Sequence, residues 1–189
     1  MKFCSHCGSA ALEFRVPEGD TLPRYVCPVC TTIHYQNPKV VVGCLPESDG
    51  QVLLCKRAIE PRRGLWTLPA GFLENGETLV AGALRETMEE AGARVKDTTL
   101  YTVISLPHIN QIYVMFRGQL ASPDFGAGPE SLEVRLFQED EVPWDELAFR
   151  TIARTLRNYF LDRKLGAFPV HESALDRRAP VPPSLSGAG

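Results

Sequence analysis

Hydrophobic and polar residues alternate between residues 37 and 168 in a pattern that predicts several strands around one long helix. The predicted strands are 39–45, 51–57, 100–106, 111–118 and 132–138. Asp49-Gly50, between the first two of them, is a strong hairpin signal. A short apolar segment at 65–68 is followed by a glycine-bounded loop at 71–76.

The clearest helix is predicted for residues 78–91. Thr78 can cap its first turn, and Gly92 is placed to end it as a C-terminal glycine. A second helix is predicted from Trp144 to about Lys164, where apolar residues recur at helical spacing. Strands that flank a central helix, with another helix at the end, indicate the α/β class and a sandwich architecture.

Composition limits the classes of protein that fit. A chain of 189 residues accommodates one full domain and a small module. The longest apolar run, 40–45, is too short to cross a bilayer, and Met1-Lys2-Phe3-Cys4 is no signal segment, so we expect a cytoplasmic protein without a membrane partner. The net charge of −3 gives no electrostatic reason for non-specific nucleic-acid binding. Residues 169–189, rich in Pro, Ser, Gly and Ala, are predicted to be a disordered tail.

Four of the six cysteines form two Cys-x-x-Cys pairs in residues 1–36, a segment that is short of core residues. The pairs are Cys4/Cys7 and Cys27/Cys30, separated by nineteen residues. This spacing is typical of a zinc ribbon with a closed, structural Cys₄ site, and two redox dithiols are the alternative. We expect the other nearby candidates, His6 and His34, to be surface or packing residues, and Cys44 and Cys55 to be buried thiols.

The predicted central helix carries three clustered carboxylates. Glu86, Glu89 and Glu90 are three and four residues apart, so all three project from one face. Because like charges repel, a cation should lie between them, and Mg²⁺ prefers such oxygen ligands. Arg85 points to a different side and can pair with Glu77, which would tie the preceding loop to the helix.

These residues resemble the Nudix box, Gly-x5-Glu-x7-Arg-Glu-U-x-Glu-Glu-x-Gly-U, where U is a bulky aliphatic residue. The chain matches all seven fixed positions, which include the supporting residues Gly71, Glu77, Arg85 and Gly92. Thr87 and the residue after Gly92, Ala93, depart from the pattern at the U positions. Segments outside the box, together with the ribbon, resemble the plant chloroplast Nudix enzymes that act on FAD and ADP-ribose, and their bacterial relatives, over about residues 3–165.

The resemblance implies a Nudix hydrolase domain at 37–168, an α/β/α sandwich with a mixed sheet, behind a zinc ribbon at 1–36. It implies Mg²⁺ or Mn²⁺ held by Glu86, Glu90, the Ala70 carbonyl and Glu89, which is either a ligand or the base. The expected catalytic residues are Glu89, Glu90 and Glu133, with Glu130 as a reserve; an ordinary surface carboxylate is the alternative for Glu133. Arg57 is the candidate for phosphate binding, and Phe72 and Tyr113 are candidates for ring contacts.

The leading interpretation is hydrolysis of FAD to FMN and AMP, or of ADP-ribose, so the expected partner is a dinucleotide or nucleotide-sugar. An NADH or NAD-cap pyrophosphatase is the alternative, but the Ser-Gln-Pro-Trp-Pro-Phe-Pro signature of those enzymes is absent at 105–113. A non-catalytic sensor with a nucleic-acid-binding ribbon should lack the box glutamates, all of which are present, and the ribbon is not basic. Relatives are commonly homodimers.

Overall fold

The computed structural model describes residues 1–176, and these fall into two compact units that divide after Pro38. The predicted boundary between residues 36 and 37 lies two residues earlier. The final part of the predicted tail, 177–189, lies outside the described residues. None of the helices in the described part is long and apolar enough to cross a membrane.

The first unit is a small antiparallel sheet of three short strands. In order, these strands are β1 (Glu13–Arg15), β2 (Arg24–Val26) and β3 (Ile33–His34). The buried residues of 1–38, all of which the structure describes, are Cys4, Pro17, Val26, Cys27 and His34. So small a set cannot form a hydrophobic core of ordinary size.

The second unit is built on a mixed sheet with the strand order β10-β5-β4-β9-β8-β11. The strands are β4 (Lys39–Ser48), β5 (Gln51–Arg57), β8 (Val95–Leu106), β9 (Gln111–Leu120), β10 (Ser131–Phe137) and β11 (His171–Ala174). Strand β4 pairs in parallel with β9, and β11 pairs in parallel with β8. Nearly every residue of β4 from Val41 to Glu47 is buried, as expected for a central strand covered on both faces.

The hairpin between β4 and β5 turns at the predicted Asp49-Gly50 pair, where both residues have positive φ as a type I′ turn requires. The two strands pair only beside this turn. Towards their other ends they separate, and β7 (Ala70–Phe72) pairs with β4 while β6 (Trp66–Thr67) pairs with β5. The first two residues of the loop predicted at 71–76 therefore belong to β7, and only the rest of that segment is loop.

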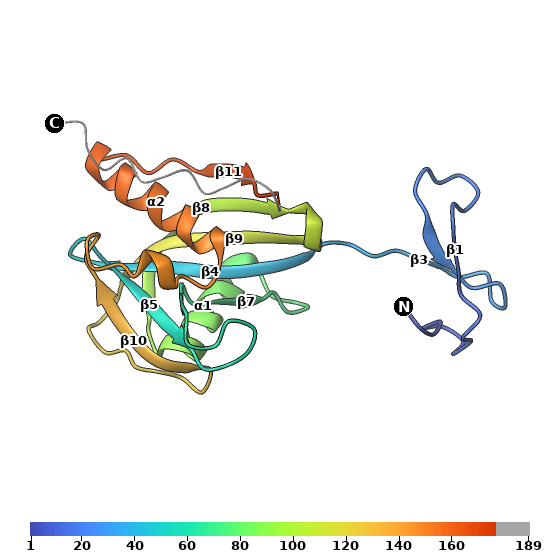
Figure 1. The fold of residues 1–189 in the computed structure, drawn as a ribbon, viewed down its shortest axis with the longest axis horizontal. Helices are drawn as coiled ribbons and strands as arrows, with labels where there is room; N and C mark the ends of the chain where they lie inside the picture. Colours follow the sequence, from blue (N-terminus) through green and yellow to red (C-terminus); the bar gives the residue numbers. More distant parts are fainter. Residues whose placement is uncertain (177–189) are drawn as a thin grey trace. The chain divides into compact units, whose positions relative to one another are not determined.

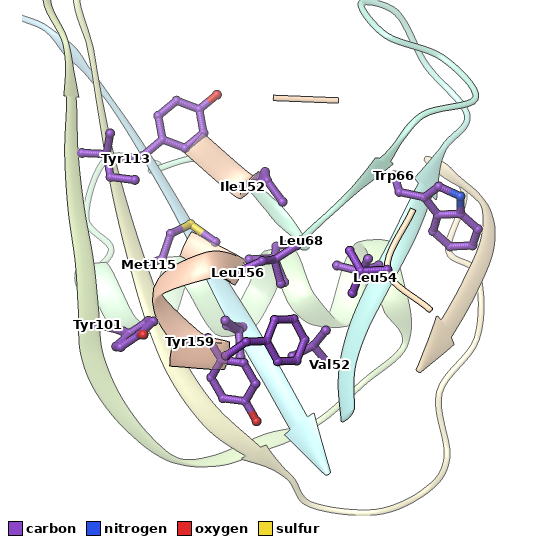
Figure 2. Packing of buried hydrophobic residues seen from close by; sticks show 14 of the residues in the cluster. Val52, Leu54, Trp66, Leu68, Tyr101, Tyr113, Met115, Ile152, Leu156 and Tyr159 are labelled. Carbon is purple, nitrogen blue, oxygen red and sulfur yellow. The ribbon is translucent and has the colours of Figure 1, made fainter. Parts of the chain in front are cut away.

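Two helices cover opposite faces of the sheet (Figure 1). The helix α2 (Arg150–Leu165) packs Ile152, Leu156 and Tyr159 onto the largest buried cluster, which Figure 2 shows from close by. The helix α1 (Leu79–Ala91) packs on the other face, where Ala83 meets residues of β4 and β9. The predicted α/β/α sandwich with a mixed sheet is therefore confirmed.

Two segments differ from the sequence predictions. The helix predicted from Trp144 is interrupted: a 3-10 turn, η2 (Trp144–Glu146), precedes α2, because the backbone at Leu147 and Ala148 pairs with Trp66 instead. Residues 171–174, predicted to belong to a disordered tail, form the edge strand β11. Hydrogen bonds to β8 and the burial of Leu175 fix this segment.

Candidate active site and metal centres

The four paired cysteines converge in the first unit. Their Sγ atoms all lie within 4.8 Å of one another. Cys4 and Cys30 are 3.6 Å apart, as are Cys7 and Cys27. A tetrahedron with Zn–S bonds of about 2.3 Å has edges of about 3.8 Å, whereas a disulfide requires about 2.05 Å. The geometry fits a closed Cys₄ metal site.

Contacts around the cysteines hold the sulfur atoms in place. Nε2 of His34, which is buried rather than at the surface, lies 3.3 Å from the Cys4 Sγ. The Thr32 hydroxyl lies 3.2 Å from the Cys30 Sγ, and this contact, with the Thr32 backbone N–H, lowers the pKa of the Cys30 thiol to about 6. Such outer contacts orient ligands, and those at Cys30 favour the thiolate form that a metal binds.

The helix α1 presents the three predicted carboxylates. Its bounds match the prediction: the Thr78 hydroxyl accepts a hydrogen bond from the Ala81 N–H, and Gly92 ends the helix with φ 57°. Thr87, one of the two departures from the aliphatic pattern, is fully buried and donates to the Ala83 carbonyl. This hydrogen bond satisfies the buried hydroxyl.

Arg85 connects the helix with the loop that precedes it. Its guanidinium forms the predicted pair with Glu77, with Nε 2.7 Å and Nη2 3.0 Å from the two carboxylate oxygens. Its Nη1 also lies 2.7 Å from a Glu86 oxygen and 3.1 Å from a Glu89 oxygen. The prediction that Arg85 points to a different side was therefore incomplete, because a long arginine side chain reaches two neighbours on its own helix.

The glutamates contact β7 closely. The Ala70 N–H donates to the Glu90 carboxylate over 3.1 Å. A Cβ on Gly71 would lie 2.4 Å from the Glu86 carboxyl group, so glycine alone leaves room for that side chain in its present position. Burial raises the pKa of Glu90 to about 7 and raises that of Glu86 above its ordinary range. Both carboxylates therefore lie where an unpaired negative charge is unfavourable.

The chemistry of this oxygen donor set fits a hard divalent cation. Among the described residues, the four cysteines form a cluster in which all potential ligand atoms lie within 4.8 Å of one another. The carboxylate oxygens of the glutamates are more widely spread. Arg85 binds Glu86 and Glu89 through one nitrogen, Nη1, whereas Glu90 is bound to β7.

A cavity of about 1040 Å³ opens beside the glutamates, entirely within the second unit. It contains Ala70, Gly71, Glu86, Glu89, Glu90 and the predicted substrate contacts Arg57, Phe72 and Tyr113. The lining of the cavity therefore combines acidic side chains, arginine side chains and apolar surface. Burial raises the pKa of Tyr113 above its ordinary value.

Glu133 is not among the residues that line the cavity, but Glu130 is. The loop before β10 approaches the end of α1, where the Gly128 N–H donates to the Glu90 carbonyl. A Cβ on Gly128 would lie 1.7 Å from the Glu89 carbonyl oxygen, so only glycine permits this approach. The loop thus brings Glu130 near the box, whereas Glu133 lies on β10 opposite Lys56. In the sequence, the two glycines of Gly126-Ala-Gly128 are the feature that could have indicated this close approach of the loop to α1.

A second group of cavity residues was not predicted from the sequence. Phe149 and Arg150, at the start of α2, line the cavity, as does Leu175 after β11. The Arg57 guanidinium carbon lies 5.2 Å from the centre of the Phe149 ring. No local motif marks these positions, because distant segments of the chain bring them together.

Comparisons with known proteins agree with this geometry. The NUDIX domain family model matches residues 37–159, and the zinc-ribbon family model described as "Nudix N-terminal" matches residues 2–36. A crystal structure of a NUDIX hydrolase from Nitrosomonas europaea is similar at 60 % identity, with a TM-score of 0.89; the alignment covers 94 % of this chain and all of that one.

Two kinds of curated relatives are similar at lower identity. An ADP-ribose pyrophosphatase of Methanocaldococcus jannaschii is 34 % identical over 61 % of this chain and 69 % of its own length. An NAD-capped RNA hydrolase, NudC of Enterobacter sp. (strain 638), is 31 % identical over 75 % of this chain but 53 % of its own length. The present chain therefore spans about half of that relative. The intact box, the cysteine cluster and the two family matches together show that the chain belongs to the Nudix family, as a Nudix hydrolase with an N-terminal zinc ribbon.

Proposed function

We propose that this Nudix hydrolase splits the diphosphate bond of a nucleoside-diphosphate derivative with Mg²⁺, or Mn²⁺, as its catalytic metal. The observation that carries the proposal is a single cavity that contains the box carboxylates, Arg57 and the rings of Phe72 and Tyr113. Carboxylates suit a hard cation, an arginine suits a phosphate, and aromatic or apolar surface suits a nucleoside. The cavity therefore matches the catalytic metal together with the diphosphate and the nucleoside of such a substrate.

Glu86, Glu90 and the Ala70 carbonyl would hold the metal, with Glu89 as a further ligand or the base. When bound, Mg²⁺ lowers the pKa of a water ligand and neutralises charge on phosphate oxygens. Arg85 orients Glu86 and Glu89 through its hydrogen bonds, and the Ala70 N–H orients Glu90. Arg57, whose guanidinium is held by the Pro61 carbonyl at 2.9 Å, is placed to bind a phosphate.

The general base is proposed to be a carboxylate in the cavity. Glu89 is exposed and can meet a water, and Glu130 lies close enough to Glu86 and Glu90 to influence their pKa values. Glu133 stays a candidate from the sequence, although it lies on β10 and does not line the cavity. A general base must lie within hydrogen-bonding distance of the water that it deprotonates.

ADP-ribose and FAD are the proposed substrates. ADP-ribose is supported by the similarity to the ADP-ribose pyrophosphatase of Methanocaldococcus jannaschii, and FAD by the resemblance described from the sequence. Hydrolysis of NADH or of NAD-capped RNA is the second candidate, supported by the NudC relative. In the ribbon, zinc is proposed as the metal, with a structural role, since four thiolates leave no coordination position for a substrate.

A substrate panel tests the proposal. The intact protein would be incubated with Mg²⁺ and FAD, ADP-ribose, NADH or NAD-capped RNA, and the products identified by mass. We expect AMP with FMN or with ribose 5-phosphate. Product formation from NADH or capped RNA alone would favour the second candidate, and inactivity on all four with full metal occupancy would refute the proposal.

A further inference from the structure

Strand β11 and the residues after it lie beyond the matched NUDIX domain, which ends at residue 159. Leu175 follows this strand directly. Its N–H donates to the Ser105 carbonyl over 2.9 Å, and its side chain is only 4 % exposed and lines the cavity. This extension of the chain therefore supplies part of the cavity wall.

The extension is attached to the domain at both ends. Asp162 on α2, 3 % exposed, accepts a hydrogen bond from the Tyr101 hydroxyl over 2.7 Å, and Nε2 of His171 lies 2.6 Å from the same carboxylate oxygen. At the other end, Arg150 donates to the Asp176 carbonyl over 2.8 Å. These contacts fix the position of Leu175 between them.

Leu175 lies far across the sheet from the carboxylates. One row of paired residues runs from β7 to β11 through Phe72, Val41, Tyr113, Ile104 and Ser173. The row crosses four strand intervals, or about 19 Å, since neighbouring strands are about 4.8 Å apart. Gly71, next to the first residue of this row, touches Glu86, whereas Leu175 follows the last strand.

The side chains near Leu175 are mostly apolar. Leu106 and Tyr113 lie in the same buried cluster as Leu175, and all three line the cavity. Leu147 packs against this cluster and lines the cavity as well. This end of the cavity suits a ring or a sugar rather than a phosphate, because buried apolar surface cannot solvate charge.

We propose that Leu175 is a specificity-determining residue, and that it contacts the half of the substrate that lies farther from the catalytic metal. His171 is a positioning residue in this proposal, because its contact with Asp162 holds β11 in place. The proposal rests on the proposed function. It extends that function by assigning an apolar subsite for one half of the substrate to a segment outside the matched domain.

Steady-state kinetics with FAD and with ADP-ribose test the subsite. Leu175→Ala should raise KM on the order of 10-fold and keep kcat within about 2-fold, because it removes a contact made equally in the ground and transition states. An equal rise for both substrates would place their shared adenosine half at Leu175. A rise for one substrate alone would place its distinctive half there.

Leu53→Ala is the matched control, since Leu53 is buried on the α1 side and does not line the cavity. It should lower the melting temperature and leave KM unchanged. If the alanine variant does not fold, Leu175→Val provides the test. It should give a smaller rise in KM. His171→Ala should raise KM as Leu175→Ala does, and His171→Gln, which keeps a donor for Asp162, should restore it.

Failure of this inference is distinguishable from failure of the proposed function. Wild-type protein that is inactive on both substrates would overturn both proposals. Active wild-type protein, together with folded Leu175→Ala and Leu175→Val variants whose KM values for both substrates are unchanged, would overturn the subsite alone.

Discussion

The two units of this protein surround their candidate metal sites in opposite ways. The ribbon has five buried residues, two of which are cysteines of the Cys₄ cluster. The Nudix domain has three buried apolar clusters and packs a helix on each face of its sheet. A structural metal would supply most of the ribbon's folding free energy, whereas the domain folds around its own core and leaves its carboxylates free for chemistry.

The two candidate metal sites also differ in how their ligand atoms are arranged. The ribbon's sulfur atoms already lie at tetrahedral separations, because their positions define the fold of that unit. The domain's carboxylates lie beside a large cavity and are held by hydrogen bonds to Arg85 and Ala70. A site that must admit a substrate needs an open position, and a site that only supports the fold does not.

The largest effect should follow from removing a ribbon ligand. Cys27→Ser should abolish zinc binding and unfold residues 1–38, since structural zinc contributes on the order of 10 kcal/mol to such modules. Metal analysis and limited proteolysis would measure this. Cys44→Ala, a change at a buried cysteine of the domain, should keep the zinc. An ordered ribbon in zinc-free Cys27→Ser protein would show that the ribbon does not need the metal to fold.

The next largest effect concerns the box. Glu90→Gln should lower kcat by about 10³-fold, because loss of a metal ligand removes several kcal/mol of charge stabilisation. The variant should keep its fold and its zinc content. Turnover at the wild-type rate by the folded variant would refute the assignment of Glu90 as a ligand.

The raised pKa of Glu90 predicts a pH dependence of stability. Its pKa is about 7 in the folded protein, against 4.5 ordinarily, so the folded state binds this proton more tightly. In magnesium-free buffer this group should therefore reduce the free energy of unfolding by about 3 kcal/mol as the pH rises from 4.5 to 7. Denaturant titrations of wild type and Glu90→Gln, compared at each pH, would isolate the contribution. A difference in unfolding free energy between the two proteins that stays the same at every pH would contradict this prediction.

The smallest effect distinguishes two carboxylates near the site. Glu130→Gln should lower kcat at least about tenfold, or about 1.4 kcal/mol, because Glu130 lines the cavity and lies near Glu86 and Glu90. Glu133→Gln should leave kcat unchanged if Glu133 stays on β10. The reverse result would show that the loop and strand rearrange when substrate binds.

Much of the site could be predicted because its signals are local. The cysteine pairs, the box and the helix with its Thr78 cap and Gly92 end are short patterns whose spacing fixes which side chains share a face. The hairpin at Asp49-Gly50 is local for the same reason. The helix predicted from Trp144 was not confirmed over its first residues, since a backbone pairing with Trp66, far away in sequence, replaced it.

Local spacing alone predicts the family, the two cysteine knuckles and the acidic face of α1, because each depends on neighbouring residues. The folded chain was needed to show that Arg85 binds Glu86 and Glu89, that Glu130 rather than Glu133 lines the cavity, and that Leu175 forms part of its wall. These facts depend on close approach between distant segments. Backbone pairing and the absence of a side chain at Gly71 and Gly128 make that approach possible.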